Sequence, residues 1–478
     1  MGANTDHALG RNLKFFSKVE TTAGAGYGTG GQETLDAADA AKVLSTGMEF
    51  TVARADRMDA RTSRSVLERI TGKQEVSWNC ESYLLPGGTS VAPDISPLLH
   101  AAFGAGPHTD GAGTATINAV TKANPAVCTT AADHGYKTGD KIYIGSVSGM
   151  TQIQNLVFTV TYVSATTFQL TGINSSAYGT FSSTATATLL TYRPTDTNSL
   201  PTIRMAREAN QVLREDLFGC WVEEVGISAS GGEEPKITFS GGAFNYALTG
   251  TGTTEGTGSG ATSLVTEAGQ GVNFMVGSSI TFDDTSGTPV PQNRIVTAKD
   301  TDTLTVASSS WADAKPITPT TYDETTTGNP INGISGSLVL NGETLPITSF
   351  DMTLTNGNKA LNDEAFEKGA TDFIAGYRSV SGTVSVRARK DFIKSFAQRY
   401  VATTATADPT FTSVVLTVTL GSTSGKKCVL TLNNCELDFA AIDIPEAEEA
   451  VLNIPYTALG SSAADESNQQ VLFDWNQT

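Results

Sequence analysis

Charged residues and histidines are scarce in this sequence of 478 residues. Only 17% of the residues are charged, and the four histidines (His7, His100, His108 and His134) include no pair at metal-ligand spacing. A catalytic triad of the hydrolase class, formed only in the folded chain, stays open as a third alternative. The sequence otherwise indicates a protein that is not an enzyme, with no catalytic residue, metal or cofactor.

Cysteine is equally rare and follows no motif. An odd number of five cysteines with no C-x-x-C pair and no histidine nearby argues against a disulfide framework and against a zinc site. We expect reduced, partly buried thiols at Cys80, Cys128, Cys220, Cys428 and Cys435.

Two signals for membranes or secretion are missing as well. The sequence has no run of 18 apolar residues and no charged leader followed by an apolar segment. We therefore expect no membrane contact, and a protein that is made and kept in the cytosol.

Positive charge falls short of negative charge. The sequence has 31 Lys and Arg against 49 Asp and Glu, a net charge of -18. This balance opposes adhesion to phosphate backbones and anionic membranes. Solubility alone is the alternative explanation of the excess acid.

One glycine-rich run, residues 26–31, formally matches the dinucleotide-binding pattern G-x-G-x-x-G. No second strand of a βαβ unit follows it, so the run is interpreted as a flexible arm or loop. No cofactor is predicted from it.

Glycine, threonine and serine are abundant, with 47 glycines in total. This composition favours many short strands joined by tight turns, so a mainly β chain is expected. Short helices are expected at residues 34–44, 93–103 and 391–400. The length suggests about three domains at roughly 150 residues each.

Internal similarity indicates that one unit occurs twice. At an offset of 310, Ile70, Gly72, Val76 and Trp78 align with Val380, Gly382, Val386 and Ala388. At an offset of 215, Cys220, Ile227, Glu233, Glu234 and Phe239 align with Cys435, Ile442, Glu448, Glu449 and Ile454. The two offsets differ by 95 residues, so the first copy must contain inserted material.

Two stretches of short strands between turn-rich segments account for the extra material. The predicted organisation has a first unit with an N-terminal arm at 1–113 and 189–250, and an inserted small β domain at 114–188. A second small β insertion with linkers follows at 251–330, and a second unit at 331–478. Both insertions are expected to be small β-barrels.

Several segments outside the insertions carry a family likeness, by their order more than singly. They are residues 61–64, 70–73, 78–86, 93–99, 226–235 and 347–357. On these segments the sequence resembles the major tail tube protein of a long-tailed, non-contractile (siphovirus-type) bacteriophage. The insertion at 114–188 resembles small β domains of phage structural proteins.

The resemblance implies a fold and a set of partners. The fold is two tandem tail-tube-type β-sandwich units, each with a short helix, whose inner sheets join neighbouring subunits into a continuous barrel. Rings of subunits stack into the virion tail, which is assembled in the host cytoplasm. The implied partners are further copies of the chain, the tape-measure, tail-tip and tail-terminator proteins, and genomic DNA that passes through without specific binding.

Charged residues gather on two repeated elements. The acidic set faces either the lumen, where it would keep DNA from sticking, or a neighbouring subunit or solvent. The basic set is the expected complement between subunits. The acidic candidates are Glu223, Glu224, Glu233, Glu234, Glu436, Asp438 and Asp443, and the basic candidates are Arg61, Arg64, Arg69, Arg387, Arg389 and Lys390.

The leading hypothesis is a structural protein that polymerises into a tail tube. The alternative is a tail-tip, baseplate or host-binding structural protein. The resemblance implies that six tube units close a ring. Because the unit occurs twice in this chain, three chains are expected to form a ring of quasi-sixfold shape.

Overall fold

The computed structural model describes most of the chain. The described residues are 13–24, 27, 34–57, 65, 68–88, 90–106, 113–195, 200–284, 290–324, 326, 328, 330–332, 336–340, 342–345, 347–362, 368–388, 414–438, 441–443, 450–460 and 470–475. The fold is mainly β, as the composition predicts. No helix in the described part is long and apolar enough to cross a membrane.

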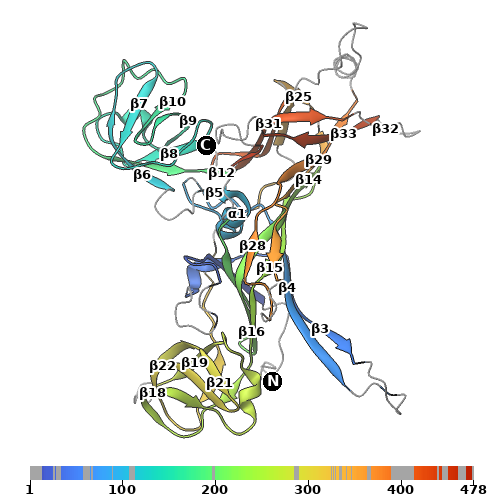
Figure 1. The fold of residues 1–478 in the computed structure, drawn as a ribbon. Helices are drawn as coiled ribbons and strands as arrows, with labels where there is room; N and C mark the ends of the chain where they lie inside the picture. The colour runs from blue at the N-terminus through green and yellow to red at the C-terminus, as the bar shows by residue number, and fades with distance from the viewer. Residues whose placement is uncertain are drawn as a thin grey trace.

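Eight antiparallel strands run side by side through the body of the molecule (Figure 1). Their order is β3-β4-β15-β14-β26-β29-β33-β31, so four strands of the first half and four strands of the second half form one continuous sheet. Their bounds are β3 Ser45–Asp56, β4 Arg69–Tyr83, β15 Lys236–Ala243, β14 Leu213–Ser230, β26 Ile347–Thr355, β29 Ser379–Arg387, β33 Val451–Ala458 and β31 Lys426–Leu437. The short strand β32 (Ala441–Asp443) continues the line of β31 and also pairs with β33.

Two long strands, β14 and β31, each take part in a second set of pairings. The first half of β14 pairs with β13 and β16, and β13 pairs with β1. The first half of β31 pairs in the same way with β30 and β34, and β30 pairs with β24. The bounds are β1 Leu13–Val19, β13 Ile203–Ala209, β16 Asn245–Thr249, β24 Gly336–Leu340, β30 Val414–Thr423 and β34 Leu472–Asp474.

The strand pairings repeat with constant residue offsets. Gly226 lies opposite Thr238, and 215 residues later Ala441 lies opposite Asn453. The paired strands β13–β14 and β30–β31 even share a register shift at the same place, after Ile203 and after Val414. Seven strands of one half therefore have counterparts in the other half.

The predicted offset of 310 between β4 and β29 is wrong by six residues. Glu81 lies opposite Ser45 and Thr238, and its counterpart Ser385 lies opposite Ser349 and Asn453. These partners fix the offset at 304. A slip of six preserves the alternation of buried and exposed residues, because side chains in a strand repeat every two residues, so the sequence pattern did not reveal the error.

One hydrophobic core serves both halves. It contains Trp78 of β4, Phe350 of β26 and Tyr456 of β33, and the rings of Phe350 and Tyr456 stack at 6.2 Å between centroids. Alternate residues of these strands are buried, which is the pattern of a sheet with one covered face. The covered face explains why the register is specified so strongly.

Helix α1 (Ser96–Phe103) lies against this core and is fully buried. Proline at its start and Gly104 at its end, with φ of 85°, delimit it as the sequence predicts. The helix expected at residues 391–400 lies outside the described residues. The one expected at 34–44 is wrong, since that stretch holds only a 3-10 turn, η2 (Ala37–Asp39), before β2 (Ala40–Ala41).

The first insertion is a closed six-stranded barrel, as predicted. Its strands follow the order β10-β7-β6-β11-β8-β9, and β9 closes the barrel onto β10. Their bounds are β6 Thr114–Val120, β7 Ala126–Thr130, β8 Lys141–Gly145, β9 Leu156–Ser164, β10 Thr167–Leu170 and β11 Ala185–Leu189. A separate core that includes Ile142 and Phe168 fills the barrel.

The second insertion is not a closed barrel, which corrects that prediction. It consists of a four-stranded sheet, β17-β23-β19-β20, and a three-stranded sheet, β18-β22-β21, around a common core. Strands β20 and β22 face each other through side chains instead of a backbone ladder, since Arg294 Nε donates to Ser309 Oγ at 2.6 Å. The bounds are β17 Gly252–Thr253, β18 Gly258–Val265, β19 Ser279–Asp283, β20 Pro291–Ile295, β21 Ala298–Asp300, β22 Thr303–Trp311 and β23 Pro316–Pro319.

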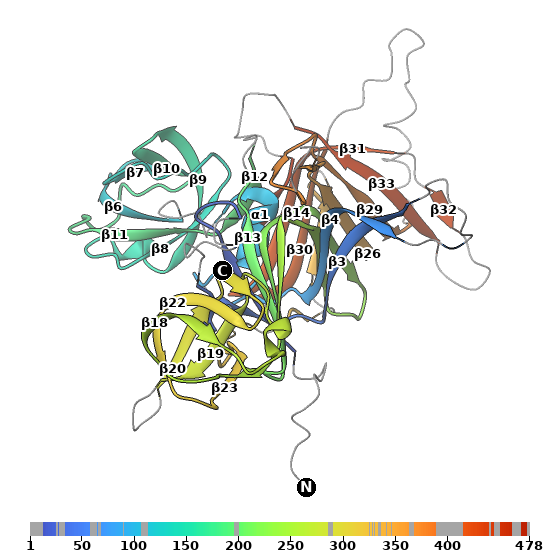
Figure 2. The ribbon, with the colours of Figure 1, turned by 60° about the horizontal axis from the view of Figure 1, so that its bottom comes forward.

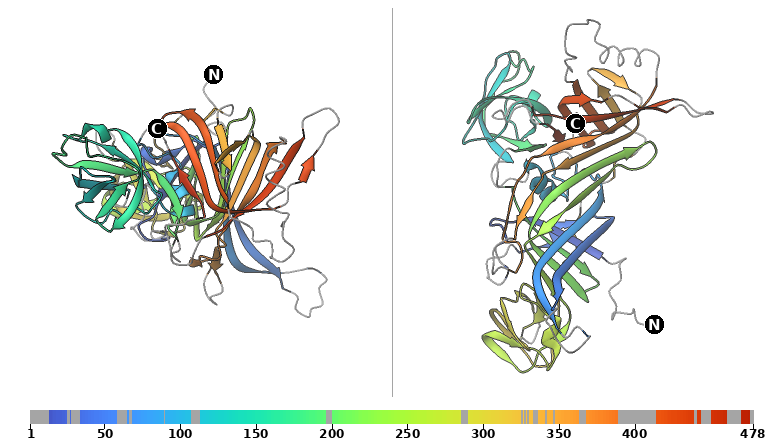
Figure 3. Two further views of the ribbon diagram at one scale, coloured as in Figure 1. Left: turned by 90° about the horizontal axis from the view of Figure 1, so that it is seen from above. Right: turned by 45° about the vertical axis from the view of Figure 1, so that its right-hand side comes forward.

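The two insertions lie at opposite ends of one side of the body (Figures 1 and 2). The hairpin of β3 and β4 projects from the other side (Figure 3). Short strands complete the molecule: β5 Gly104–Ala105, β12 Thr191–Pro194, β25 Glu343–Leu345, β27 Lys359–Leu361 and β28 Asp372–Ile374.

Candidate functional site

The long sheet has two open edges. Among the described residues, β3 pairs only with β4, and β32 pairs only with β33. In Figure 1 these two strands lie at different ends of the body, both away from the insertions. An unpaired strand edge is a template for pairing with another strand, so the two edges are the first candidate site.

The junction of β14 with β26 shows how such an edge is filled. Seven residue pairs join these strands, from Glu224 opposite Thr355 to Ser230 opposite Ser349. Strand β26 is the counterpart of β3, and the second half of β14 is the counterpart of the end of β31 with β32. The chain therefore contains, within itself, the pairing that the two edges lack in the described part of the structure.

The offsets translate this junction into a specific register. Gly226 lies opposite Thr353 in the internal junction. Its counterpart on the open edge is Ala441, and the counterpart of Thr353 is Glu49. By the same rule Met48 corresponds to Met352 and Ile442 to Ile227.

Side chains close one end of the β3 edge. Arg207 Nη1 donates to the carbonyl of Thr46 at 2.8 Å, while its other donors bind Glu215. The N–H of Gly47 points to β4 and donates to Asn79 Oδ1 at 3.0 Å. The open stretch of this edge therefore begins after Thr46, with Met48 as the next residue whose backbone groups face away from β4.

One face of the eight-stranded sheet is polar along its full width. A single row of paired residues crosses all eight strands, and every member is partly or fully exposed. The row is Ser45, Glu81, Thr238, Gly226, Thr353, Ser381, Thr457 and Glu436.

This polar face is rich in carboxylates. Alternation along the strands places Glu49, Glu75, Glu224 and Asp351 on the same face as the row, and all four are exposed. Lys236 Nζ offsets one further acid on this face, lying 3.1 Å from Glu81. The face therefore repels polyanions.

The predicted neighbours Glu223 and Glu224 have different surroundings. Glu224 is exposed on the polar face. Glu223 lies at a register shift of β14, where it accepts a hydrogen bond from the N–H of Asn358 at 2.8 Å. Burial raises the pKa of Glu223, against the lowering effect of these backbone hydrogen bonds.

The predicted Glu233 and Glu234 lie in the exposed turn between β14 and β15, away from the polar row. Ser230 Oγ donates to Glu233 Oε2 at 3.1 Å, which stabilises the turn. Their place is typical of a solvated turn.

In the second half, the predicted acids lie near the open edge. Glu436 is exposed in the polar row, and Asp438 follows β31 with its N–H donating to the Pro455 carbonyl at 2.9 Å. Asp443 is the last residue of β32, opposite Val451. Asp438 is the counterpart of Glu223. In the internal junction Glu223 is covered by the connection between β26 and β29, through its hydrogen bond with Asn358.

The predicted basic residues are described only in part. Arg69 forms an ion pair with Asp56, 2.9 Å apart, and both side chains are about half exposed. Arg387 is exposed at the end of β29, opposite Val451. Arg61, Arg64, Arg389 and Lys390 lie outside the described residues.

An aromatic cluster on the polar face was not predicted. Trp221 packs over Gly242, where even a methyl group would meet the indole at 2.3 Å, and the ring of Phe373 stacks on Trp221 at 5.6 Å between centroids. Phe373 belongs to β28, which lies in the connection between β26 and β29. This connection therefore packs against β14. The glycine pair at 241–242 was the only sequence signal for this close packing.

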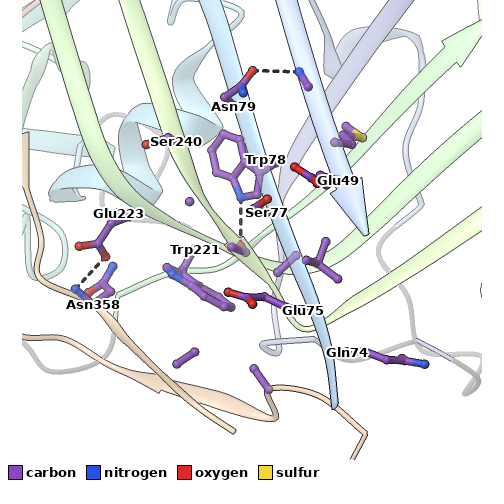
Figure 4. A pocket seen from close by; sticks show the side chains of 18 of the residues that line it. Glu49, Gln74, Glu75, Ser77, Trp78, Asn79, Trp221, Glu223, Ser240 and Asn358 are labelled. Atoms are coloured by element: carbon purple, nitrogen blue, oxygen red, sulfur yellow. Dashed lines mark hydrogen bonds between the residues drawn. The ribbon is translucent and has the colours of Figure 1, made fainter. Parts of the chain in front are cut away.

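Beside this cluster lies a cavity of about 780 Å³ (Figure 4). Its lining includes Glu49, Glu75 and Glu223 together with Trp78, whose Nε1 donates to the Gly242 carbonyl at 3.0 Å. The described lining contains carboxylates and amides but no lysine, arginine or histidine. The described residues also include no cluster of three or more His, Cys, Asp or Glu that could hold a metal ion.

Comparison of the sequence with family models and with curated proteins finds no match.

Proposed function

We propose that this chain is a structural subunit that polymerises with copies of itself into a phage tail tube, a hollow conduit for DNA. The observation that carries the proposal is the pairing of β14 with β26, because the corresponding edges at β32 and β3 have no strand partner among the described residues. Because β3 and β32 correspond to β26 and β14, the β3 edge of one copy of the chain matches the β32 edge of another. The tail-tube-type identity of the two repeated units rests on the sequence resemblance.

Closure of the sheet is the physical reason for assembly. A long open edge exposes unpaired backbone groups and invites aggregation, and a closed ring removes both edges at once. The ring would expose one continuous polar face, on which Glu49, Glu75 and Glu224 are repeated in every copy. If this face lines the channel, its carboxylates leave DNA free to slide.

Tail-tip, baseplate or host-binding roles remain the second candidate, because the closed barrel at residues 114–189 is a separate module on the outside of the body (Figure 2). Abundance separates the two candidates. A tube subunit should be among the most plentiful proteins of a purified virion, whereas a tip protein is present in few copies.

The test compares proline at two matched positions, Met48 and Met352. The carbonyl of Thr46 accepts from Arg207 outside the β3–β4 pair, and Met48 lies two residues further along, so its N–H points to the same open side of β3. Proline at Met48 removes a donor from the open edge only, whereas Met352→Pro removes a donor from a strand paired on both sides. Met48→Pro should still fold in a thermal melt yet form no tubes in negative-stain images, and Met352→Pro should fail to fold.

The parent protein should form hollow tubes when concentrated. Tubes of normal appearance from Met48→Pro would show that β3 is not part of the interface. A parent protein that stays monomeric at every concentration would contradict the proposed function itself.

A further inference from the structure

A second cavity, of about 220 Å³, lies where the second insertion meets the body. The body contributes Arg204 of β13 and Arg214 of β14, and the insertion contributes Ser279 of β19 and Arg294 of β20. Tyr322, which follows the insertion, completes the wall. The cavity is therefore built by segments that are far apart in the sequence.

The described lining of this cavity has only one sign of charge. Its charged side chains are Arg204, Arg214 and Arg294, with no Asp or Glu among the described lining residues. The other polar lining groups are hydroxyls and one amide, from Thr34, Ser279, Asn293, Thr297, Thr320 and Tyr322. Guanidinium groups and hydroxyls are the donors that recognise oxyanions in proteins.

Two of the arginines, Arg204 and Arg214, are held in place by hydrogen bonds to one carboxylate, that of Asp216. Arg214 donates to both oxygens of Asp216, at 2.8 and 2.9 Å, and Arg204 Nη2 donates to the same carboxylate at 3.0 Å. All three side chains are buried. Glu208 adds a second negative charge near Arg214, so this inner group is balanced.

Arg294 brings a charge that the inner group does not balance. Its guanidinium donates to Ser309 Oγ at 2.6 Å, to Gln292 Oε1 at 3.0 Å and to the Asn293 carbonyl at 2.9 Å, all neutral acceptors. No carboxylate forms an ion pair with it in the described part of the chain. The cavity therefore carries about one net positive charge, and the hydroxyl of Ser279, which accepts from Arg204, keeps its own proton to donate.

We propose that this cavity binds an oxyanion of the class of inorganic phosphate, which links the second insertion to the body of the chain. A volume of 220 Å³ has room for such an anion with a few waters, since a water occupies about 30 Å³. Burial also lowers the pKa of Arg204, which shows that its positive charge is costly there and that a bound anion would relieve it. The net charge of -18 makes unspecific anion binding elsewhere unfavourable.

The test is calorimetric titration of the folded full-length protein with inorganic phosphate, with sodium chloride at matched ionic strength as the reference. Arg294→Gln removes the outer arginine and leaves the buried group of Arg204, Arg214 and Asp216 in place. It should weaken phosphate binding about tenfold or more, the loss expected for one charge-assisted hydrogen bond. Arg69→Gln, the same substitution at an exposed arginine far from the cavity, should leave the affinity unchanged.

Three outcomes overturn the proposal: no phosphate binding beyond the chloride reference, equal binding by Arg294→Gln, or equal weakening by Arg69→Gln. Titration with acetate distinguishes the source of the anion. If acetate binds as tightly as phosphate, a carboxylate side chain of another protein is the better ligand, and the free oxyanion is rejected. Tube formation does not enter these readouts, so the result is independent of the proposed function.

Discussion

Several of the few charged residues of this chain are buried at the places where the insertions join the body. Arg193 of β12 pairs with Asp140 of the barrel, both almost fully buried. Arg204 and Arg214 share Asp216 beside the second insertion. A buried pair adds little net stability, but breaking one is costly. The pair of Arg193 and Asp140 therefore fixes the barrel on the body, and the group around Asp216 holds Arg204 where it donates to Ser279 of the second insertion.

Asp474 is the residue with the clearest pH dependence. It lies in β34 beneath the barrel, where Thr191 Oγ1 donates to it, with Lys141, Asp140 and Arg193 as the charged groups around it. Burial raises the pKa of Asp474 to about 7, against about 4 in an unfolded chain. The folded state therefore holds the proton more tightly than the unfolded state does.

The sign of the effect follows directly. A carboxyl with a raised folded pKa contributes its stability at low pH and loses it as the pH rises through the folded pKa. Between pH 5 and pH 8 the parent should lose about 3 kcal/mol more unfolding free energy than Asp474→Asn, which keeps an acceptor for Thr191 but cannot ionise. Denaturant unfolding of both proteins at the two pH values measures this difference. Parallel pH profiles would show that Asp474 is ionised in the folded protein.

The strand pairings show which parts of the fold the sequence could predict. The offset of 215 was correct because Cys220 and Cys435 lie at equivalent buried positions and the strands that follow have equal lengths. The offset between β4 and β29 was wrong because a slip of six residues keeps the buried face buried. The correct offset of 304 becomes clear only from the residues opposite Glu81 and Ser385 on the two strands that flank each of them.

Contacts between distant segments lay beyond the reach of the sequence. The pairing of β14 with β26, the stacking of Phe373 on Trp221 and the cavity around Arg204 depend on three-dimensional placement, and no local pattern encodes it. The open form of the second insertion was missed for a similar reason. Strand alternation identifies strands, but closure of a barrel depends on which edges meet.

The register of the proposed interface gives a direct test at β3 and β32. If the open edges pair as β26 and β14 do, Glu49 of one copy lies opposite Ala441 of the next. Cysteines placed at these two positions in one chain should form disulfides between copies under mild oxidation, because directly opposite strand residues come within disulfide range. Non-reducing gels of assembled protein should then show covalent dimers and trimers.

Two matched pairs serve as controls. Cysteines at Ser228 and Asp351, opposite in the internal junction, should close within one chain and leave a monomer on the gel. Cysteines at Thr51 and Ala441, shifted by two residues, should cross-link poorly. The five natural cysteines are buried and form no disulfide, so they do not interfere. Equal cross-linking of the shifted pair would rule out this register.

The barrel insertion should be removable. The chain enters and leaves it through neighbouring residues, since the N–H of Leu189 donates to the Gly113 carbonyl at 2.7 Å and Thr114 lies opposite Thr188. Replacing residues 114–188 by a short Gly/Ser bridge should leave β12 paired with β34 and β13 paired with β14. Thermal melting, size-exclusion chromatography and electron microscopy should show a folded protein that still assembles. Insoluble or unfolded protein would mean that the body depends on the barrel for its stability.

The two repeated halves and their shared sheet determine the symmetry of the proposed ring. Each chain contributes two successive four-strand sets, β3-β4-β15-β14 and β26-β29-β33-β31, joined in the same way that neighbouring chains would be joined. If six such sets close the ring, as the resemblance to tail tube proteins implies, three chains are enough. The unequal insertions, one within the first half and one between the halves, would mark the outside with threefold symmetry.

Cryo-electron microscopy of the tube, reconstructed without imposed symmetry, should therefore show three chains per ring and a quasi-sixfold bore. The inner wall should be one closed sheet in which the joint between β14 and β26 alternates with the joint between β32 and β3 of the next chain. Closure explains why both halves keep the same register while their surfaces differ, because a shift in either half would leave an open edge in every ring. Six whole chains per ring would contradict the argument from duplication, and an inner wall with gaps between chains would contradict the edge pairing.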